Sequence, residues 1–251
     1  MRRYFYKFMP INDYTIKNLT NNQIWFSSPL DFNDPFDYFV PHNLNFTDDE
    51  FRKIIYRPPN IPEEQYNQML QYCKENPKEF EKWIENGQSN FTSKNRVACF
   101  CEEKTNILMW SHYAASHEGL CLKFDSSYDN RFFHEDDWNY HKMPIKKVIY
   151  PKKIKKINYF KDNNNFFFNC AYTKSHQWYY EKEHRIISAV DSIKFNKKSL
   201  VEINFGCKLN QEDSKVQDII KLVKSCKYPN VKFIQANKCK DRFELEFEEI
   251  Q

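Results

Sequence analysis

Glycine occurs only three times in the 251 residues, at Gly87, Gly119 and Gly206. Phosphate-binding loops of the Walker type and dinucleotide-binding turns need several closely spaced glycines, because backbone N–H groups must approach the phosphate oxygens. No two of the three glycines lie close enough to form such a loop. The sequence therefore excludes P-loop and Rossmann chemistry.

The rest of the composition is that of a folded, aromatic-rich chain. Hydrophobic residues make up 41% of the sequence and aromatic residues 18%, so the chain can bury a sizeable core. We predict one domain spanning residues 1–251. The formal net charge of +4 is too small for a dedicated nucleic-acid binder. The basic run "KKVIYPKKIKK" (146–156) is interpreted as a solvated strand and loop, with a phosphate-binding stripe as the alternative.

Apolar residues do not form a targeting or membrane segment. The N-terminal "MRRYFYKFMP" has no uninterrupted apolar stretch, and nowhere do about 18 apolar residues follow one another. We therefore expect a cytoplasmic protein with no membrane partner. Its eight cysteines are spread singly, without a C-x-x-C pair, and are expected to be reduced and mostly small core residues. The sequence does not indicate an oligomeric state.

Hydrophobic periodicity predicts an α+β fold with a mixed β-sheet core. A short helix is expected over 13–19, with Asp13 as its cap and Ile16 and Leu19 facing inward. Further helices are expected over 107–119, after 166 and over about 211–226. Alternation predicts strands over 3–8, 23–28, 95–101, 120–125, 199–205, 231–236 and 242–250.

A helical lobe is predicted between residues 47 and 94, inserted into this domain. The sequence "TDDE" has the spacing of a capping box, and Pro62 and Pro77 stand where helices begin. Gly87 follows "EFEKWIEN" as a helix C-cap does.

The stretch "FNDPFD" (32–37) places polar groups between two phenylalanines. Asp34 is pushed toward extended geometry by the following Pro35, whose ring fixes its own φ, so the loop is stiff. In one interpretation Asn33 or Asp34 caps a following helix while Phe32 and Phe36 staple the loop to the core. In the other, the loop holds Asn33 and Asp34 rigidly in a binding pocket.

The segment 107–119 is expected to be mainly structural. His112 and His117 are five residues apart, about 140° around a helix, which is poor geometry for sharing a metal. Glu181 and His184 have a suitable i, i+3 spacing, but no second such pair is evident, and we expect no metal. Any functional role of the 107–119 helix is assigned to Ser111 or His112. The apolar residues that follow the i, i+3, i+4 rule are predicted to be core: Met109, Trp110, Tyr113 and Ala114.

The segment "WYYEKEHRIIS" (178–188) places Glu181, Glu183 and Arg185 on one face if it is a strand. The simple interpretation is a charged, solvent-facing edge in which Arg185 pairs with a glutamate. In the functional interpretation the two carboxylates sit at a cleft, where one stabilises a cationic transition state and the other orients an acceptor. The rings of Trp178, Tyr179 and Tyr180 offer flat surfaces for stacking.

Four ordered motifs carry a family resemblance: "YKF", "IWFSSPLDFNDPFD", "CFC…ILMWSHYAASHEGLCLKF" and "KSHQWYYEKEHRI". Together they resemble the bacterial domain-of-unknown-function family 2971. The resemblance covers roughly residues 3 to 190. It implies a role in bacterial conflict, as a toxin or an antiphage defence effector.

A second similarity is to ADP-ribosyltransferase-like proteins. Some of these place an arginine on a first strand, a serine on a middle strand and a Glu-x-Glu at the end, whose second glutamate is catalytic. The matching positions here are Arg2 or Arg3, Ser27 with Ser28, and Glu181 with Glu183. The middle strand is either "WFSS" or "ACFC", where Cys101 stands in for a serine.

This similarity implies an enzyme that uses NAD as its substrate and either transfers ADP-ribose to a protein or nucleic-acid acceptor or hydrolyses NAD. Glu183 is the predicted oxocarbenium stabiliser and Glu181 the group that orients the acceptor. We expect the FNDPFD loop to pack near 178–185. The predicted substrate-binding residues are Tyr6, Ser27, Asn33, Asp34, His112, Trp178 and Arg185.

Two alternatives belong to other classes. A non-enzymatic nucleotide or single-stranded nucleic-acid binder would stack bases on the aromatic residues and hold phosphates with the 146–156 run. A protein-interaction module would dock a partner on the helical lobe, with structural charged clusters.

Overall fold

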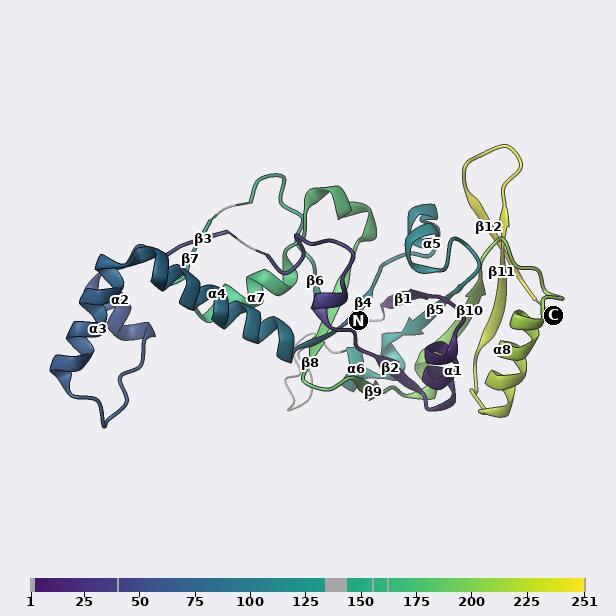
Figure 1. Ribbon diagram of the computed structural model, residues 1–251. Coiled ribbons are helices and arrows are strands. Elements are labelled where there is room, and N and C mark those ends of the chain that lie inside the picture. The colour runs from purple at the N-terminus through teal and green to yellow at the C-terminus, as the bar shows by residue number, and fades with distance from the viewer. Residues whose placement is uncertain (1–2, 40, 134–143, 155, 162, 251) are drawn as a thin grey trace. The chain divides into compact units, whose positions relative to one another are not determined.

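The computed structural model describes residues 3–39, 41–133, 144–154, 156–161 and 163–250 of the chain (Figure 1). The chain divides into two compact units. Unit 1 comprises Met1–Ser27, Arg96–Val148 and Gln177–Gln251, and unit 2 comprises Ser28–Asn95 and Ile149–His176. Helices together with mixed sheets confirm the α+β fold class. One domain over 1–251 stays a prediction.

Unit 1 is built on a five-stranded sheet of order β1-β5-β10-β11-β12. The strands are β1 (Tyr4–Met9), β5 (Leu120–Asp125), β10 (Leu200–Phe205), β11 (Lys232–Lys238) and β12 (Leu245–Glu249). Neighbours are antiparallel except β10 and β11, which are parallel. A parallel pair needs a crossover connection. Helix α8 (Ser214–Ser225) lies in that connection, as the predicted amphipathic helix (Figure 1).

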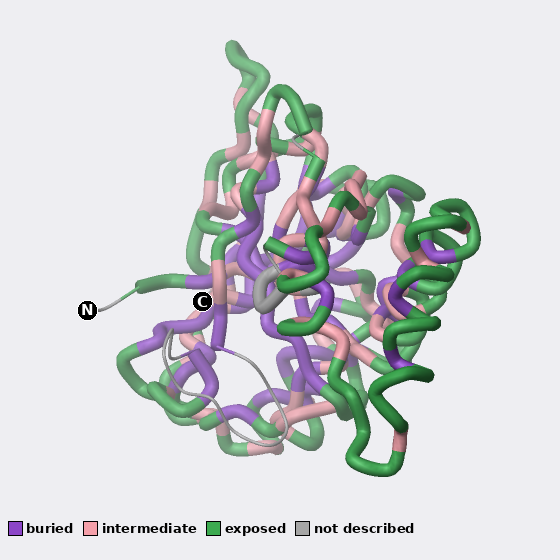
Figure 2. The backbone as a smooth tube through the Cα atoms, turned by 90° about the vertical axis from the view of Figure 1, so that its left-hand side faces the viewer, coloured by how far each residue is buried: buried purple, intermediate pink, exposed green. Residues whose placement is uncertain are grey.

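One face of this sheet carries the main apolar core of unit 1. Phe5, Leu122 and Ile203 point into it from three strands, and the buried stripe of α8 is part of the same cluster: Val216, Ile219, Ile220 and Val223. Their spacing is the i, i+3, i+4, i+7 pattern of an amphipathic helix. Buried residues are frequent in β5 and β10, whereas β12 is largely exposed. Figure 2 shows the buried stretches of the backbone in purple and the exposed stretches in green.

Helix α1 (Asp13–Thr20) corrects two details of the sequence-based prediction. Its N-cap is Asn12, whose side chain accepts a hydrogen bond from the Thr15 N–H at 3.1 Å, and not Asp13. Leu19 is buried as predicted, but Ile16 is 43% exposed. The buried polar residues Thr15 and Asn18 take the inward positions beside Leu19.

A second sheet in unit 1 has the order β4-β8-β6, all antiparallel. Its strands are β4 (Arg96–Phe100), β8 (His184–Ser188) and β6 (Lys146–Lys147). The two sheets are linked by an antiparallel bridge, in which the N–H groups of Tyr6 and Cys101 donate to each other's carbonyls at 2.9 and 2.8 Å. A two-stranded sheet of β2 (Gln23–Trp25) and β9 (Ser192–Lys194) completes the pairing.

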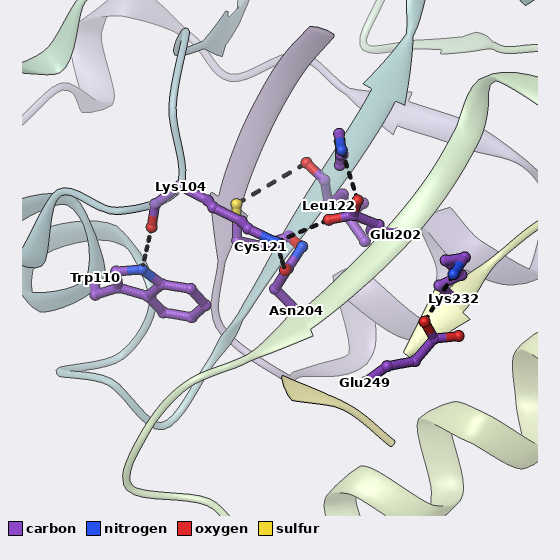
Figure 3. A network of polar contacts seen from close by, with 9 residues as sticks. Lys104, Trp110, Cys121, Leu122, Glu202, Asn204, Lys232 and Glu249 are labelled. Carbon is purple, nitrogen blue, oxygen red and sulfur yellow. Dashed lines mark hydrogen bonds and ion pairs between the residues drawn. The ribbon is translucent and has the colours of Figure 1, made fainter. Parts of the chain in front are cut away.

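On the other face of the five-stranded sheet, α5 (Ile107–Tyr113) packs with Phe8 and Cys121 in a smaller apolar cluster, which borders a polar network. The Trp110 indole N–H donates to the Lys104 carbonyl at 2.7 Å, and the Lys104 ammonium reaches Glu202 at 2.9 Å and Asn204 at 2.7 Å (Figure 3). Lys123 binds the other oxygen of Glu202 at 2.5 Å. Met109, Trp110 and Ala114 are buried as predicted, whereas Tyr113 is only half-buried.

Helix α5 ends at Tyr113, six residues before the predicted end at 119. Three successive non-glycine residues, Ala115, Ser116 and His117, have positive φ angles of 47°, 54° and 71°, which no α-helix accommodates. This turn lies against Gly206, where an added Cβ would come within 2.2 Å of the His117 carbonyl oxygen. Glycine at 206 is therefore required by the close approach of two backbones.

Unit 2 contains the predicted helices, α2 (Asp48–Ile54), α3 (Glu63–Glu75) and α4 (Pro77–Lys94), with α7 (Asn163–Tyr172) and a short pair of strands, β3 (His42–Asn43) and β7 (Ile157–Asn158). The capping box between Thr47 and Glu50 and the two proline helix starts are confirmed. The predicted end at Gly87 is wrong, because α4 continues through this glycine to Lys94.

The core of unit 2 is aromatic and joins two distant stretches of chain. Phe51, Phe80 and Ile84 come from the helices before residue 95, and Phe160 and Phe166 from the segment after 149. The Phe51 and Phe160 rings stack at 5.8 Å with an angle of 23° between their planes. The predicted helical insertion is therefore packed around a second, later segment.

Short helical turns complete the chain: η1 (Pro29–Asp31), η2 (Ser126–Tyr128), α6 (Asn130–Phe133), η3 (His176–Glu181) and η4 (Lys197–Ser199). None of the described helices is long and apolar enough to cross a membrane. All eight cysteines are free thiols. Three are buried, Cys101, Cys121 and Cys170, and the other five are partly exposed, so the prediction that most are core residues is wrong.

Candidate active site

Glu183 and Arg185 form a buried ion pair at the start of β8. The Arg185 Nε and a terminal nitrogen donate to the two oxygens of Glu183 at 2.7 and 3.1 Å. Arg185 is fully buried and Glu183 is 4% exposed, so the solvent-facing edge of the simple interpretation is wrong, although its pairing is correct. Paired, bidentate geometry is what allows two charges to stay ionised away from water.

Glu181 ends η3 and lies outside the strand. Lys182, with a φ of 45°, turns the chain between the two glutamates, and β8 begins only at His184. Glu181 is 2% exposed, and its Oε1 accepts a hydrogen bond of 2.5 Å from the Tyr113 hydroxyl. Burial, then Glu181 and Glu183, raise the pKa of Tyr113 well above its ordinary value. Both carboxylates therefore act electrostatically on the same phenol.

Strands β4 and β1 add a thiol and an ammonium to this group. Cys99 lies opposite Arg185 across the β4–β8 ladder. Burial, followed by the charge of Glu183, raises the pKa of Cys99 well above its ordinary value. The Lys7 ammonium donates to the Cys99 carbonyl at 3.2 Å, and burial lowers the pKa of Lys7.

An aromatic group lies next to the carboxylates, where α5 meets η3. The His112 ring lies 6.1 Å from Trp178 and 6.4 Å from Tyr180, and the latter two are 5.9 Å apart. Asn106 joins the two elements, because its side chain caps α5 and also donates to the Tyr180 carbonyl at 2.8 Å. His112 is exposed and the other two rings are half-buried, so a planar ligand can reach them.

Tyr6 and Ser27 are two further predicted residues of unit 1, and Tyr6 belongs to the same apolar cluster as Tyr113 and Tyr180. The Tyr6 ring lies 6.0 Å from the Lys123 ammonium, and its pKa is raised by burial and then by Glu202, which places it in the Glu202 network. Ser27 forms a β-bridge with Val97 of β4. Val97 lies three residues, about 10 Å at the rise of a strand, from Phe100, which pairs with His184 at the start of β8. Of the two candidate middle strands, the one that pairs with β8 is β4, which includes most of "ACFC".

Asn33 and Asp34 belong to unit 2, and their proximity to Glu183 stays a prediction. Asp34 is buried and its Oδ1 accepts the Phe36 N–H at 2.9 Å, which makes the loop a side-chain-supported turn and not a helix cap. Asn33 is exposed. Phe36 is 69% exposed, so the expected staple to the core is wrong for this ring.

Sequence reasoning missed the roles of Lys7, Cys99 and Tyr113. Tyr113 was assigned to the core with its neighbours, although its hydroxyl binds Glu181. Lys7 stands between Phe5 and Met9 on the inward face of β1, and a lysine in such a position was the available signal. Arg2 lies outside the described residues, and Arg3 lines a cavity described below. Among the residues described, no cluster of three or more His, Cys, Asp or Glu could hold a metal.

A family model described as "Protein of unknown function (DUF2971)" matches residues 109–186. This range begins in α5 and ends in β8, so it contains Tyr113, both glutamates and Arg185. The match supports the family resemblance over these residues. No curated protein and no solved structure matches the chain.

Proposed function

We propose that unit 1 is an ADP-ribosyltransferase-like enzyme that binds NAD and breaks its bond between nicotinamide and ribose. The observation that carries the proposal is the pair of buried carboxylates, Glu181 and Glu183, beside Tyr113. Cleavage of the glycosidic bond develops positive charge on the ribose, which a nearby carboxylate stabilises. Such stabilisation is stronger where water is excluded.

Glu183 is assigned the electrostatic role. Arg185 holds its carboxylate in one orientation through two hydrogen bonds, so little reorganisation is needed as the oxocarbenium ion forms. The bond between the nicotinamide nitrogen and ribose breaks, and its electron pair leaves with nicotinamide. Arg185, which is fully buried, positions Glu183 in this assignment.

Glu181 is assigned to the incoming group. An acceptor hydroxyl attacks the ribose carbon and gives its proton to the Glu181 carboxylate. Tyr113 positions that carboxylate through its hydrogen bond. The rings of His112, Trp178 and Tyr180 supply stacking surfaces for nicotinamide or adenine. None of these contacts requires a glycine-rich phosphate loop.

The test is release of nicotinamide from NAD by the wild type, Glu183→Gln and Glu181→Gln, with melting curves as folding controls. Glu183→Gln keeps an acceptor for Arg185 but removes the charge, and should lower the rate about 10²–10³-fold while NAD still raises the melting temperature. Glu181→Gln should spare slow hydrolysis and impair transfer to an acceptor. Glu248→Gln, at an exposed position on β12, is the matched control.

Two outcomes would contradict this assignment in different ways. Wild-type protein that neither binds nor cleaves NAD at about millimolar concentration, weak even for an enzyme substrate, removes NAD as the substrate. Equal activity of the wild type and Glu183→Gln leaves an enzyme but moves its charged group elsewhere. Tyr113→Phe separates positioning from folding, because it should follow Glu181→Gln in its pattern while melting close to the wild type.

A second candidate function is nucleotide or single-stranded nucleic-acid binding without catalysis. A cavity of about 660 Å³ in unit 1 is lined by three basic residues, Arg3, Lys146 and Lys147, together with His184 and Glu102. Phosphate neutralisation makes nucleic-acid binding fall steeply with salt. An oligonucleotide that does not bind at low salt removes this candidate. No thermal shift with NAD, ADP-ribose, ATP or short RNA would instead favour the interaction module.

A further inference from the structure

A thiol and an imidazole meet in a second cavity of unit 1. The cavity, of about 480 Å³, is lined by the β11–β12 hairpin from Lys238 to Leu245, and by Ile107, His117, Cys207 and Lys208. Within it the Cys207 Sγ lies 3.6 Å from the His117 Nδ1, within hydrogen-bonding distance for sulfur. Neither residue contributes to the carboxylate site.

The His117 ring is held in place from several sides. It stacks nearly parallel to the Trp110 indole, with ring centres 6.5 Å apart and an angle of 13°. The backbone N–H of His117 donates to the Trp110 carbonyl at 3.1 Å, and the backbone carbonyl of His117 accepts from the Lys208 N–H at 3.2 Å. These contacts maintain the left-handed turn described above. Strained backbone that the surroundings enforce is found preferentially at functional sites.

The charge around this pair is mainly positive. Lys208, Lys238 and Lys240 line the cavity, and no ion pair of these three lysines is found in the described part of the chain. Arg242 is engaged with Asp241 and Glu244, both at 3.4 Å, and Asp241 also accepts from the Cys239 thiol at 2.9 Å. The three lysines therefore remain available to an anionic group that enters.

The protonation state of the His117 imidazole allows it to act as a base. Burial, and then the charges of Lys208 and Lys238, lower the pKa of His117 below its ordinary value. At neutral pH the ring is therefore mostly uncharged and can accept a proton. A neighbouring imidazole and lysines are the surroundings in which cysteine thiolates form and react.

We propose that Cys207 is a nucleophilic thiol, with His117 as its base, in a cavity that admits small anionic electrophiles. In the step, the thiol proton passes to the His117 Nδ1 and the sulfur attacks the electrophilic carbon. A sulfur–carbon bond forms, and the leaving group departs with the electron pair of the bond that breaks. No oxidant or reductant is required. The proposal is independent of the NAD-cleaving function.

The experiment compares two alkylating probes of similar size, iodoacetate and iodoacetamide, of which only the first carries a negative charge. Alkylation of the full chain is followed by mass spectrometry of the peptide that contains Cys207, with urea-unfolded protein as the reference. We expect the ratio of the iodoacetate rate to the iodoacetamide rate to be about three- to tenfold higher in the folded protein, because charges a few ångströms away attract the anion.

Three variants distinguish the role of His117 as a base from the effect of the positive charges of the lysines. His117→Asn tolerates a left-handed backbone but lacks the base, and should slow both reagents at pH 7 by about tenfold or more without changing their ratio. The double variant Lys208→Gln/Lys238→Gln should return the ratio toward the unfolded value. Lys198→Gln, an exposed lysine in η4, is the matched control and should change neither quantity.

The proposal is overturned if Cys207 in the folded protein alkylates no faster than in the unfolded chain and shows the same ratio of rates. It is also overturned if His117→Asn leaves the iodoacetamide rate unchanged. Melting curves accompany each variant. If His117→Asn does not fold, the double lysine variant and the wild-type ratio still decide the matter, because neither depends on that substitution.

Discussion

Arg185 in unit 1 and Arg52 in unit 2 each hold a glutamate at close range, but in opposite surroundings. The Arg185 and Glu183 side chains are 0% and 6% exposed, whereas those of Arg52 and Glu63 are 38% and 56% exposed. Water screens the second pair and is absent from the first. The same type of contact therefore fixes the orientation of a carboxylate in unit 1, but contributes little to the stability of unit 2.

The largest expected effect comes from breaking the buried pair. Arg185→Met leaves the Glu183 charge buried without its partner and should lower the free energy of unfolding by about 3–5 kcal/mol. Urea denaturation measures the loss. The double variant Arg185→Met/Glu183→Leu should recover most of it, because it removes both charges. A double variant as unstable as the single one would contradict this account.

The pH dependence of stability tests a second buried group of unit 1. Burial lowers the pKa of His184 below its ordinary value. The charge of Glu102 raises this pKa, whereas the charges of Lys147 and Arg3 lower it further. The folded state therefore binds fewer protons than the unfolded state, and stability should fall as the pH falls below about 6.5, by at most about 1.4 kcal/mol per pH unit. His184→Leu should flatten this slope in urea titrations between pH 7 and 5. An unchanged slope would assign the loss to other groups.

In the helical part of unit 2 the expected effects are local and smaller. Thr47→Ala removes the hydroxyl that accepts the Glu50 N–H in the capping box and should cost about 1 kcal/mol. Thermal unfolding measures it, with Thr47→Ser as the control that keeps the cap. A Thr47→Ser protein as unstable as Thr47→Ala would show that the methyl group, and not the cap, matters.

The smallest effect should come from the exposed pair itself. Arg52→Gln removes contacts to Glu63 and Asn67 and should change stability by only about 0.2–1 kcal/mol. The difference between wild type and variant should shrink in high salt, because exposed charges are screened. A loss as large as that of Arg185→Met would end the contrast between the two regions.

Local sequence patterns predicted most of the helices and strands. A capping box, prolines and alternating apolar residues depend on residues near one another in sequence, and they placed β5, β10 and the starts of α2, α3 and α4 closely. The helix after Asn106 was predicted too long, because the left-handed turn at 115–117 depends on contacts with Gly206, which lies far away in the chain. Gly87 was misjudged for the converse reason, since packing carries α4 through a residue of poor helix propensity.

The candidate site was predicted only in part for the same reason. Glu181, Glu183 and Arg185 follow one another in sequence, so their relation was visible there. Their partners Tyr113, Cys99 and Lys7 come from α5, β4 and β1, and only the tertiary pairing brings them together. No local pattern distinguishes the hydroxyl of Tyr113 from that of any other tyrosine on a helix.

The divided core of unit 2 has a consequence for the order of events on the ribosome. Phe51, Phe80 and Ile84 are synthesised well before Phe160 and Phe166, with the stretch 96–148 of unit 1 in between. The aromatic surface of the nascent helices therefore stays exposed while residues 96–148 are synthesised. Aggregation competes with folding during this period. Synonymous codons that slow translation between residues 96 and 148 should lengthen that period and lower the soluble yield, and chaperones that bind exposed aromatic surface should restore it.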